Sequence, residues 1–165
     1  MTTNPFALTR PLQRSHQVVG LHAEEAVPLS AAAFGPPVLM VHGAFHDWWA
    51  YAKWLPWFAI LGIRAFALSV RYHEGSRQLT AAEYRDTGTE HYVEDIASVI
   101  AWLGEPVVLI GHSLGGLIVQ KAAEGVDVGA VAYIGSASPA GVGATRDFTW
   151  DESAPLMFDR GRMRG

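Results

Sequence analysis

The stretch Ile110-Gly111-His112-Ser113-Leu114-Gly115-Gly116 decides the fold. An apolar run comes directly before it and a helical pattern over 114–124 follows, so the stretch predicts a sharp turn from a strand into a helix. The glycines two residues to either side of Ser113 are expected because side chains there would collide with the neighbouring strand and helix. The turn would lift the Ser113 hydroxyl clear of a sheet and place it at a helix N-terminus, where backbone N–H groups stabilise negative charge.

Short apolar runs alternate with helical patterns on both sides of this turn. Strands are predicted at 38–41, 63–70, 106–110 and 130–135, and helices at 48–61, 89–103 and 114–124. Pro56 must either kink the first of these helices or mark a new start within it. Such alternation favours right-handed crossovers and a mostly parallel sheet with helices on both faces. The predicted fold class is therefore α/β, to which residues 18–19 and 27–29 add one or two edge strands.

Length and composition narrow the class of protein. A chain of 165 residues fits one domain, whose pattern is clear from 36 to 140, while 141–165 is expected to form the start of a cap or a disordered tail. Half of the residues are hydrophobic, which rules out a disordered chain. The formal net charge of −4 argues against a protein that binds nucleic acid. There is no cysteine, no signal sequence and no uninterrupted apolar span, so we expect a cytoplasmic protein without membrane contact.

A second motif, Val41-His42-Gly43-Ala44-Phe45-His46, follows the predicted strand 38–41. One N–H group does not saturate a developing oxyanion, and the loop after an earlier strand is the place for a second donor. The amides of Ala44 and Leu114 are the predicted pair. His42 and His46 are four residues apart, but Gly43 and the loop setting argue against a helical metal pair, so no metal and no cofactor is expected.

Three runs carry a resemblance to a known family: H-G-A-F-H at 42–46, A-L-S-V-R-Y-H-E-G-S at 67–76 and G-H-S-L-G-G at 111–116. The sequence resembles the α/β-hydrolase superfamily, in its small esterase-like and hydroxynitrile-lyase-like branch, although such relatives usually have Gly where Tyr72 and Glu74 stand. The resemblance implies Ser113 as nucleophile, an oxyanion hole at Ala44 and Leu114, and a small carboxylic ester or related acyl substrate. It also implies an α/β-hydrolase fold that lacks its last strands and most of its cap.

The resemblance implies a catalytic acid and a histidine after the nucleophile. No histidine follows Ser113, and Asp147, Asp151 and Asp159 do not stand at a position where the family has its acid. All seven histidines precede Ser113, and the place for an acid after the strand 130–135 holds Ser136, Ala137 and Ser138. A serine hydroxyl is a poor nucleophile unless a base removes its proton, so this chain alone should have weak or no activity. His46 is the best substitute base among the earlier histidines.

Four residues near the second motif are candidates for a substrate pocket: Gly43, Phe45, His46 and Trp48. The tryptophans 48, 49, 54 and 57 crowd one predicted helix, where they would pack between helix and sheet or, in the functional interpretation, wall an apolar pocket.

Three hypotheses remain open at this stage. The first is a serine hydrolase that is a piece of a longer protein. The second is a non-catalytic binding module, with a homodimer through the open sheet edge at 130–135. The third is a lyase of the same fold that cleaves, for example, a cyanohydrin.

Overall fold

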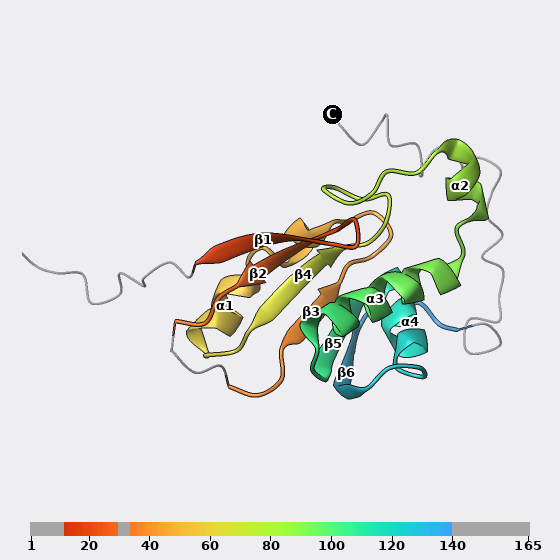
Figure 1. The fold of residues 1–165 in the computed structure, drawn as a ribbon. Helices are drawn as coiled ribbons and strands as arrows, with labels where there is room; N and C mark the ends of the chain where they lie inside the picture. Colours follow the sequence, from red (N-terminus) through yellow and green to blue (C-terminus); the bar gives the residue numbers. More distant parts are fainter. Residues whose placement is uncertain (1–11, 30–33, 140–165) are drawn as a thin grey trace, which may run out of the picture.

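The computed structural model describes residues 12–29 and 34–139, and Figure 1 shows their arrangement. One six-stranded sheet forms the centre, with strand order β1-β2-β4-β3-β5-β6. The strands are β1 Gln13–Val18, β2 Leu21–Ala26, β3 Val38–Val41, β4 Ala65–Ser69, β5 Val107–His112 and β6 Val128–Ile134. The helices are the 3-10 helix η1 Trp48–Tyr51 and the α-helices α1 Leu55–Ile60, α2 Ala81–Asp86, α3 Thr89–Leu103 and α4 Leu114–Ala122.

The neighbouring strands β4, β3, β5 and β6 run parallel to one another. β2 pairs antiparallel with β4, and β1 pairs antiparallel with β2. The α3 and α4 helices cover one face of the sheet, where Leu39, Phe66 and Leu109 are buried, and η1 and α1 cover the other, where Met40 and Ala67 are buried. The α/β fold with helices on both faces is confirmed. The carboxyl ends of β3, β4 and β5 meet at one edge of this sheet, which brings the loops after them together.

One or two edge strands are predicted at residues 18–19 and 27–29; the structure has two strands at this side of the sheet, of which β1 is the edge, and their positions differ from the prediction. They span 13–18 and 21–26, and the expected strand residue Val19 lies in the turn between them with φ of +51°. The apolar pattern is obscured because β2 buries two carboxylates, those of Glu24 and Glu25. Ser15 and His16 of β1 hydrogen-bond these side chains, so the polar groups are satisfied inside the sheet.

The segment 48–61, predicted to be a helix that Pro56 either kinks or starts anew, forms two helices, η1 and then α1. Pro56 stands in the first turn of α1, where its missing N–H costs nothing, so it starts a helix and does not kink one. The buried side chains of this segment are Tyr51, Leu55 and Ala59, spaced four residues apart. This spacing leaves three of the tryptophans outside the core, and Trp49, Trp54 and Trp57 are 47%, 43% and 63% exposed.

The α2 helix was not predicted, because it has no apolar periodicity and buries no side chain. Its N-terminus is held by a capping box, in which Thr80 Oγ1 accepts from the Glu83 amide and Glu83 Oε2 accepts from the Thr80 amide. Residues 141–165, where a cap or tail was expected, lie outside the described part of the chain.

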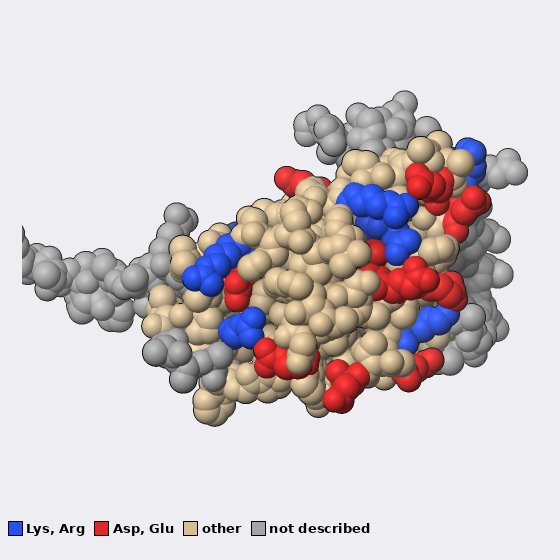
Figure 2. Space-filling model, in the orientation of Figure 1, with Lys and Arg blue, Asp and Glu red and all other residues tan. Residues whose placement is uncertain are grey.

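Acidic and basic side chains lie close to one another on the face shown in Figure 2. Exposed ion pairs such as Arg77–Glu83 and Arg64–Glu105 account for part of this pattern. Among the helices that the structure describes, none combines the length and the apolar character needed to cross a bilayer.

Candidate active site

The sharp turn predicted around Ser113 is present between β5 and α4. Ser113 has φ of +53°, a conformation that a side-chain-bearing residue adopts only under the constraint of its surroundings. A Cβ atom at Gly111 would lie 2.3 Å from the Gly115 oxygen, and one at Gly115 would lie 2.3 Å from the Val41 oxygen. Both glycines are therefore required by backbone packing under the turn.

Backbone hydrogen bonds hold Ser113 in place from three sides. Its N–H donates to the Ile134 carbonyl at 3.0 Å, and its carbonyl accepts from the amides of Gly116 and Ala137, each at 3.0 Å. The side-chain hydroxyl has no hydrogen-bond partner among residues 12–29 and 34–139. The serine is thus positioned, but no described group takes its proton.

The loop after β3 lies directly against this turn. A Cβ atom at Gly43 would be 3.1 Å from both Ser113 Cβ and His112 Nδ1, so glycine lets the loop approach the serine. The predicted oxyanion-hole residues Ala44 and Leu114 line one cavity of about 130 Å³. Its other lining residues are His42, Gly43, Phe45, Val70, His73, Tyr84, Tyr92 and Ile118.

His42 orients the peptide unit that carries the Ala44 amide. Its Nδ1 lies 2.8 Å from the Gly43 carbonyl oxygen, and since a carbonyl only accepts, Nδ1 donates the proton. The Gly43 carbonyl and the Ala44 N–H belong to one trans peptide and point in opposite directions. By holding the carbonyl, His42 sets the direction of the Ala44 N–H. Its Nε2 accepts from the Val70 amide at 3.3 Å, and the ring is buried.

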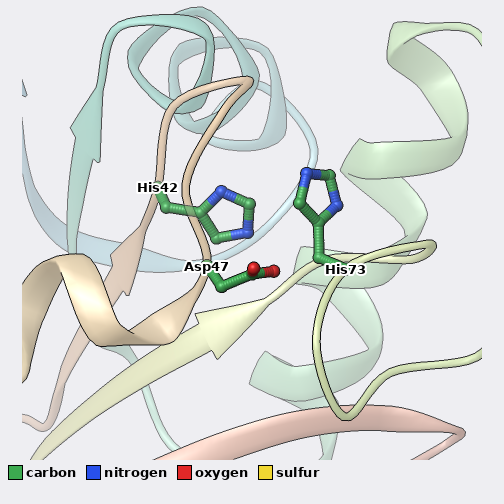
Figure 3. A group of neighbouring side chains, drawn as sticks. All are labelled: His42, Asp47 and His73. Carbon is green, nitrogen blue, oxygen red and sulfur yellow. The ribbon is translucent and has the colours of Figure 1, made fainter. Parts of the chain in front are cut away.

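His42, Asp47 and His73 form a cluster at the carboxyl ends of β3 and β4, and Figure 3 shows them gathered between the two loops. Their potential ligand atoms lie within 4.8 Å of one another, a spacing at which a metal could be considered. However, these atoms already have polar partners within the protein. Both His42 nitrogens form hydrogen bonds, and Asp47 Oδ1 accepts one from the Glu74 amide at 2.7 Å. His73 Nδ1 lies 3.0 Å from the Arg71 carbonyl oxygen, and its Nε2 lies 3.4 Å from the Ala44 carbonyl oxygen. A metal would have to replace these bonds, so the arrangement fits a brace between two loops better than a metal site.

A buried ion pair supports the second of these loops from α3. Arg71 Nη2 and Nε donate to Asp95 Oδ1 at 2.7 and 3.0 Å, and the Arg71 amide donates to Asp95 Oδ2 at 2.9 Å. The hydrogen bonds to Asp95 are the largest cause that raises the pKa of Arg71 above its usual value. Sequence analysis missed Asp47, Arg71, His73 and Asp95; the signal was that the first three follow adjacent parallel strands.

The four pocket candidates do not gather in one place. Gly43 and Phe45 line the same cavity as Ala44 and Leu114. His46 lines a separate cavity of about 280 Å³ with Trp49 and His112, and its buried Nδ1 has no hydrogen-bond partner in the described part of the chain. Trp48 is not among the residues that line either cavity, and its amide donates to Ser69 Oγ at 3.2 Å.

The alpha/beta hydrolase family matches the sequence over residues 38–164. This match spans most of the chain and includes the turn at Ser113 and the loop at 42–47. The chain therefore belongs to the alpha/beta hydrolase family. A search of curated proteins found no match.

Several solved structures share the fold. An epoxide hydrolase from an endophytic Streptomyces is 28% identical with a TM-score of 0.62, over 76% of this chain and 37% of that one. An epoxide hydrolase A from Mycobacterium thermoresistibile is 26% identical with a TM-score of 0.59, over 74% and 38%. An epoxide hydrolase from Vigna radiata is 22% identical with a TM-score of 0.62, over 77% and 41%, and shows the fold alone. The chain spans about two fifths of the length of these structures.

Proposed function

We propose that this chain carries the nucleophile and oxyanion hole of a serine hydrolase that acts on a small carboxylic ester or related acyl substrate. The observation that carries the proposal is Ser113 at φ of +53°, next to a cavity that the Ala44 and Leu114 residues line. In the proposed step, the Ser113 oxygen adds to the acyl carbon, the alcohol leaves, and water later releases the acid. The two amides stabilise the negative oxygen that forms in each half.

The size and lining of the cavity favour a short, uncharged acyl group. A cavity of roughly 150 Å³ is known to hold a benzene molecule, and the volume here is about 130 Å³. Among the described residues that line the cavity there is no Asp, Glu, Lys or Arg side chain. The apolar part of the lining consists of Phe45, Val70, Tyr84, Tyr92 and Ile118. A short acyl group, from acetyl to butyryl in length, therefore fits this site better than a charged or long-chain group.

Epoxide hydrolysis is the second candidate, because the similar structures named above are epoxide hydrolases. The chemistry of Ser113 argues against it. Attack of a hydroxyl oxygen on an epoxide carbon would open the ring and form an ether, whose C–O bonds water does not cleave under mild conditions. Attack on an acyl carbon forms an ester, which water can hydrolyse, so a serine nucleophile at this position supports turnover of acyl substrates and not of epoxides.

No described residue is placed to remove the proton of the Ser113 hydroxyl, which limits the expected rate of acylation. A positioned general base contributes typically 10²–10⁴-fold, and the Ser113 hydroxyl has no described partner of that kind. His46, the substitute proposed above, lines the other cavity, and His42 uses both ring nitrogens. We therefore expect slow acylation, with the oxyanion hole alone still giving a measurable excess over water.

Labelling with a fluorophosphonate probe tests the nucleophile. The unmodified chain should become covalently labelled, whereas Ser113→Ala should not; Ser138→Ala, which alters an exposed serine a short distance along the chain, is the matched control and should label like the unmodified chain. Equal labelling of all three proteins, or no labelling of any, would refute the role of Ser113.

Substrate assays separate the two candidate functions. The chain should release p-nitrophenol from p-nitrophenyl acetate faster than Ser113→Ala does, and should not convert styrene oxide to its diol. Diol formation that depends on Ser113 would overturn the acyl proposal in favour of epoxide chemistry.

A further inference from the structure

The turn that follows β4 holds a tyrosine in a backbone conformation that favours glycine. The His73 amide donates to the Val70 carbonyl at 3.2 Å, which closes a four-residue turn. Tyr72 is the third residue of this turn and has φ of +66°, as in a type II turn. Glycine is the usual residue at that position, because a side chain there is strained. The tyrosine therefore indicates that contacts of its side chain hold it in this conformation.

The ring of Tyr72 contacts the α2 helix. Its centroid lies 4.7 Å from the centroid of the Tyr84 ring, and the two planes are tilted by 42°. The Tyr72 amide donates to the Arg77 carbonyl at 2.8 Å, so the loop that carries the ring is closed before α2 begins. Aromatic pairs at this separation attract each other beyond the effect of the area they bury. The contact therefore ties the Tyr84 ring to a turn at the end of β4.

Tyr84 is part of the wall of the candidate active site. It lines the cavity of about 130 Å³, whereas Tyr72 is not among the described residues of that lining. The α2 helix buries no side chain, so its own packing does little to fix how far the Tyr84 ring reaches into the cavity. The contact with Tyr72 can fix this, because the turn of Tyr72 lies between two further lining residues, Val70 and His73.

We propose that Tyr72 is a positioning residue that sets the length of the acyl group accepted by the site. With the Tyr72 ring in place, Tyr84 closes the cavity at a volume that fits a short acyl group. Without this ring, Tyr84 can move away together with α2, and a longer acyl chain enters. The inference rests on the proposed function, because it concerns the acyl group that lies in the same cavity.

Hydrolysis of p-nitrophenyl butyrate and p-nitrophenyl octanoate measures the effect. Tyr72→Gly removes the ring and suits the turn, so this variant should fold. Its ratio of kcat/KM for butyrate to kcat/KM for octanoate should fall about tenfold, within the range that pocket contacts with methylene groups give. Tyr72→Phe keeps the ring and should keep the ratio of the unmodified chain. An unchanged ratio in Tyr72→Gly would overturn the proposal.

Val19→Gly is the matched control for the relief of backbone strain. Val19 has φ of +51° in the turn between β1 and β2, and it is not among the described residues that line the cavity. The Arg77 amide donates to the carbonyl of its neighbour Gly20 at 2.6 Å, so this turn contacts the loop that Tyr72 begins. Val19→Gly should leave the ratio unchanged. An equal fall in both glycine variants would mean that loosening of the loop, and not the Tyr72 ring, sets the preference.

A double-mutant cycle tests whether Tyr72 acts through Tyr84. Tyr84→Ala removes the wall itself and should lower the ratio as Tyr72→Gly does; α2 buries no side chain, so this variant should also fold. The double variant should not differ from Tyr84→Ala alone, since both changes act on one contact. Additive effects would overturn the role assigned to Tyr72. Circular dichroism checks that each variant is folded.

Binding to an unreactive chain separates this inference from the role of Ser113. In the Ser113→Ala background, Tyr72→Gly should strengthen the equilibrium binding of the octanoate ester relative to the butyrate ester. This shift in a chain that the fluorophosphonate probe does not label would refute the proposed nucleophile and support the role of Tyr72. Labelling at Ser113 without a shift in either assay would support the nucleophile and overturn the role of Tyr72.

Discussion

The two walls of the cavity beside Ser113 are built differently. On one wall, Gly43, Ala44 and Leu114 belong to backbone segments packed so closely that a Cβ atom at Gly43 would approach Ser113 Cβ to 3.1 Å. On the other wall, Tyr84 comes from α2, a short helix that buries no side chain, and its ring lies against that of Tyr72, tilted by 42° with centroids 4.7 Å apart. In the proposed reaction, the negatively charged oxygen would form at the first wall, whose close backbone packing resists movement. The acyl group of the substrate would contact the second wall.

This difference separates two roles within one site. Stabilising an oxyanion requires donors that are already in place before the reaction, which close backbone packing provides. Accommodating different acyl groups requires a wall that can be changed without loss of the fold. Substitutions that support the first wall should therefore cost far more stability than substitutions in α2.

The largest effect is expected for Gly115→Ala. The added Cβ would lie 2.3 Å from the Val41 oxygen, so α4 or β3 would have to shift, at a cost we expect to exceed about 3 kcal/mol. The matched control is Gly125→Ala, whose added Cβ would meet its nearest neighbour, the Ala122 oxygen, at 4.0 Å. Urea unfolding should show a large loss for the first variant and little change for the second; equal midpoints would contradict the packing argument.

The next effect is expected for Asp95→Ala, which removes the partner of Arg71. The Arg71 and Asp95 side chains are 15% and 7% exposed, and an unpaired charge left in such a place costs about 3 kcal/mol. Glu94→Ala removes a neighbouring carboxylate that is 67% exposed and 3.5 Å from Arg71, so it should cost less than about 0.5 kcal/mol. Thermal unfolding of both variants measures the contrast, and similar losses would show that Asp95 does not support the loop.

A smaller effect with a pH signature is expected at Tyr51, beneath the first wall. Its hydroxyl donates to the Val41 carbonyl at 2.9 Å, and burial raises the pKa of Tyr51 from 10.0 to about 12. The unfolded chain loses this proton first, so the stability that the neutral hydroxyl contributes is complete below pH 10 and is lost as the pH rises to about 12.

Tyr51→Phe should cost about 1 kcal/mol at neutral pH, the net value of one hydrogen bond, and should flatten this loss of stability. Urea unfolding of the two proteins between pH 10 and 12 provides the comparison. An identical pH profile for both would show that another group is responsible.

The smallest global effect is expected in the second wall, for Thr80→Ala. Loss of the capping box should weaken α2 by about 1 kcal/mol, but α2 buries no side chain, so the unfolding midpoint of the whole domain should hardly move. Amide exchange should accelerate in 81–86 and stay unchanged in α3. A clear drop in the midpoint would mean that the two walls are more strongly coupled than their packing indicates.

Local patterns predicted much of the fold. The strands at 38–41 and 106–110, the helices at 89–103 and 114–124, and the turn at Ser113 follow from apolar runs and glycine spacing. Local patterns failed where burial depended on distant partners. The buried carboxylates of Glu24 and Glu25 interrupt the apolar pattern of β2, and Pro56 left open whether the helix at 48–61 is kinked or starts anew.

The candidate site was predicted in the same uneven way. The loop after the strand 38–41 was predicted to lie beside the turn at Ser113, because parallel strands end at the same side of a sheet. The brace of His42, Asp47 and His73 was missed, since hydrogen bonds from side chains to distant backbone groups leave no periodic signal in a sequence.

By itself, the sequence determined the α/β class, the sharp turn at Ser113 and the family, because these depend on local backbone constraints that specific residues satisfy. Only the tertiary structure decided which of the pocket candidates share a cavity. Phe45 lines the cavity with Ala44 and Leu114, and its neighbour His46 lines a different one. It also decided which tryptophans are exposed. These properties depend on contacts between residues far apart in the chain, and no local pattern records them.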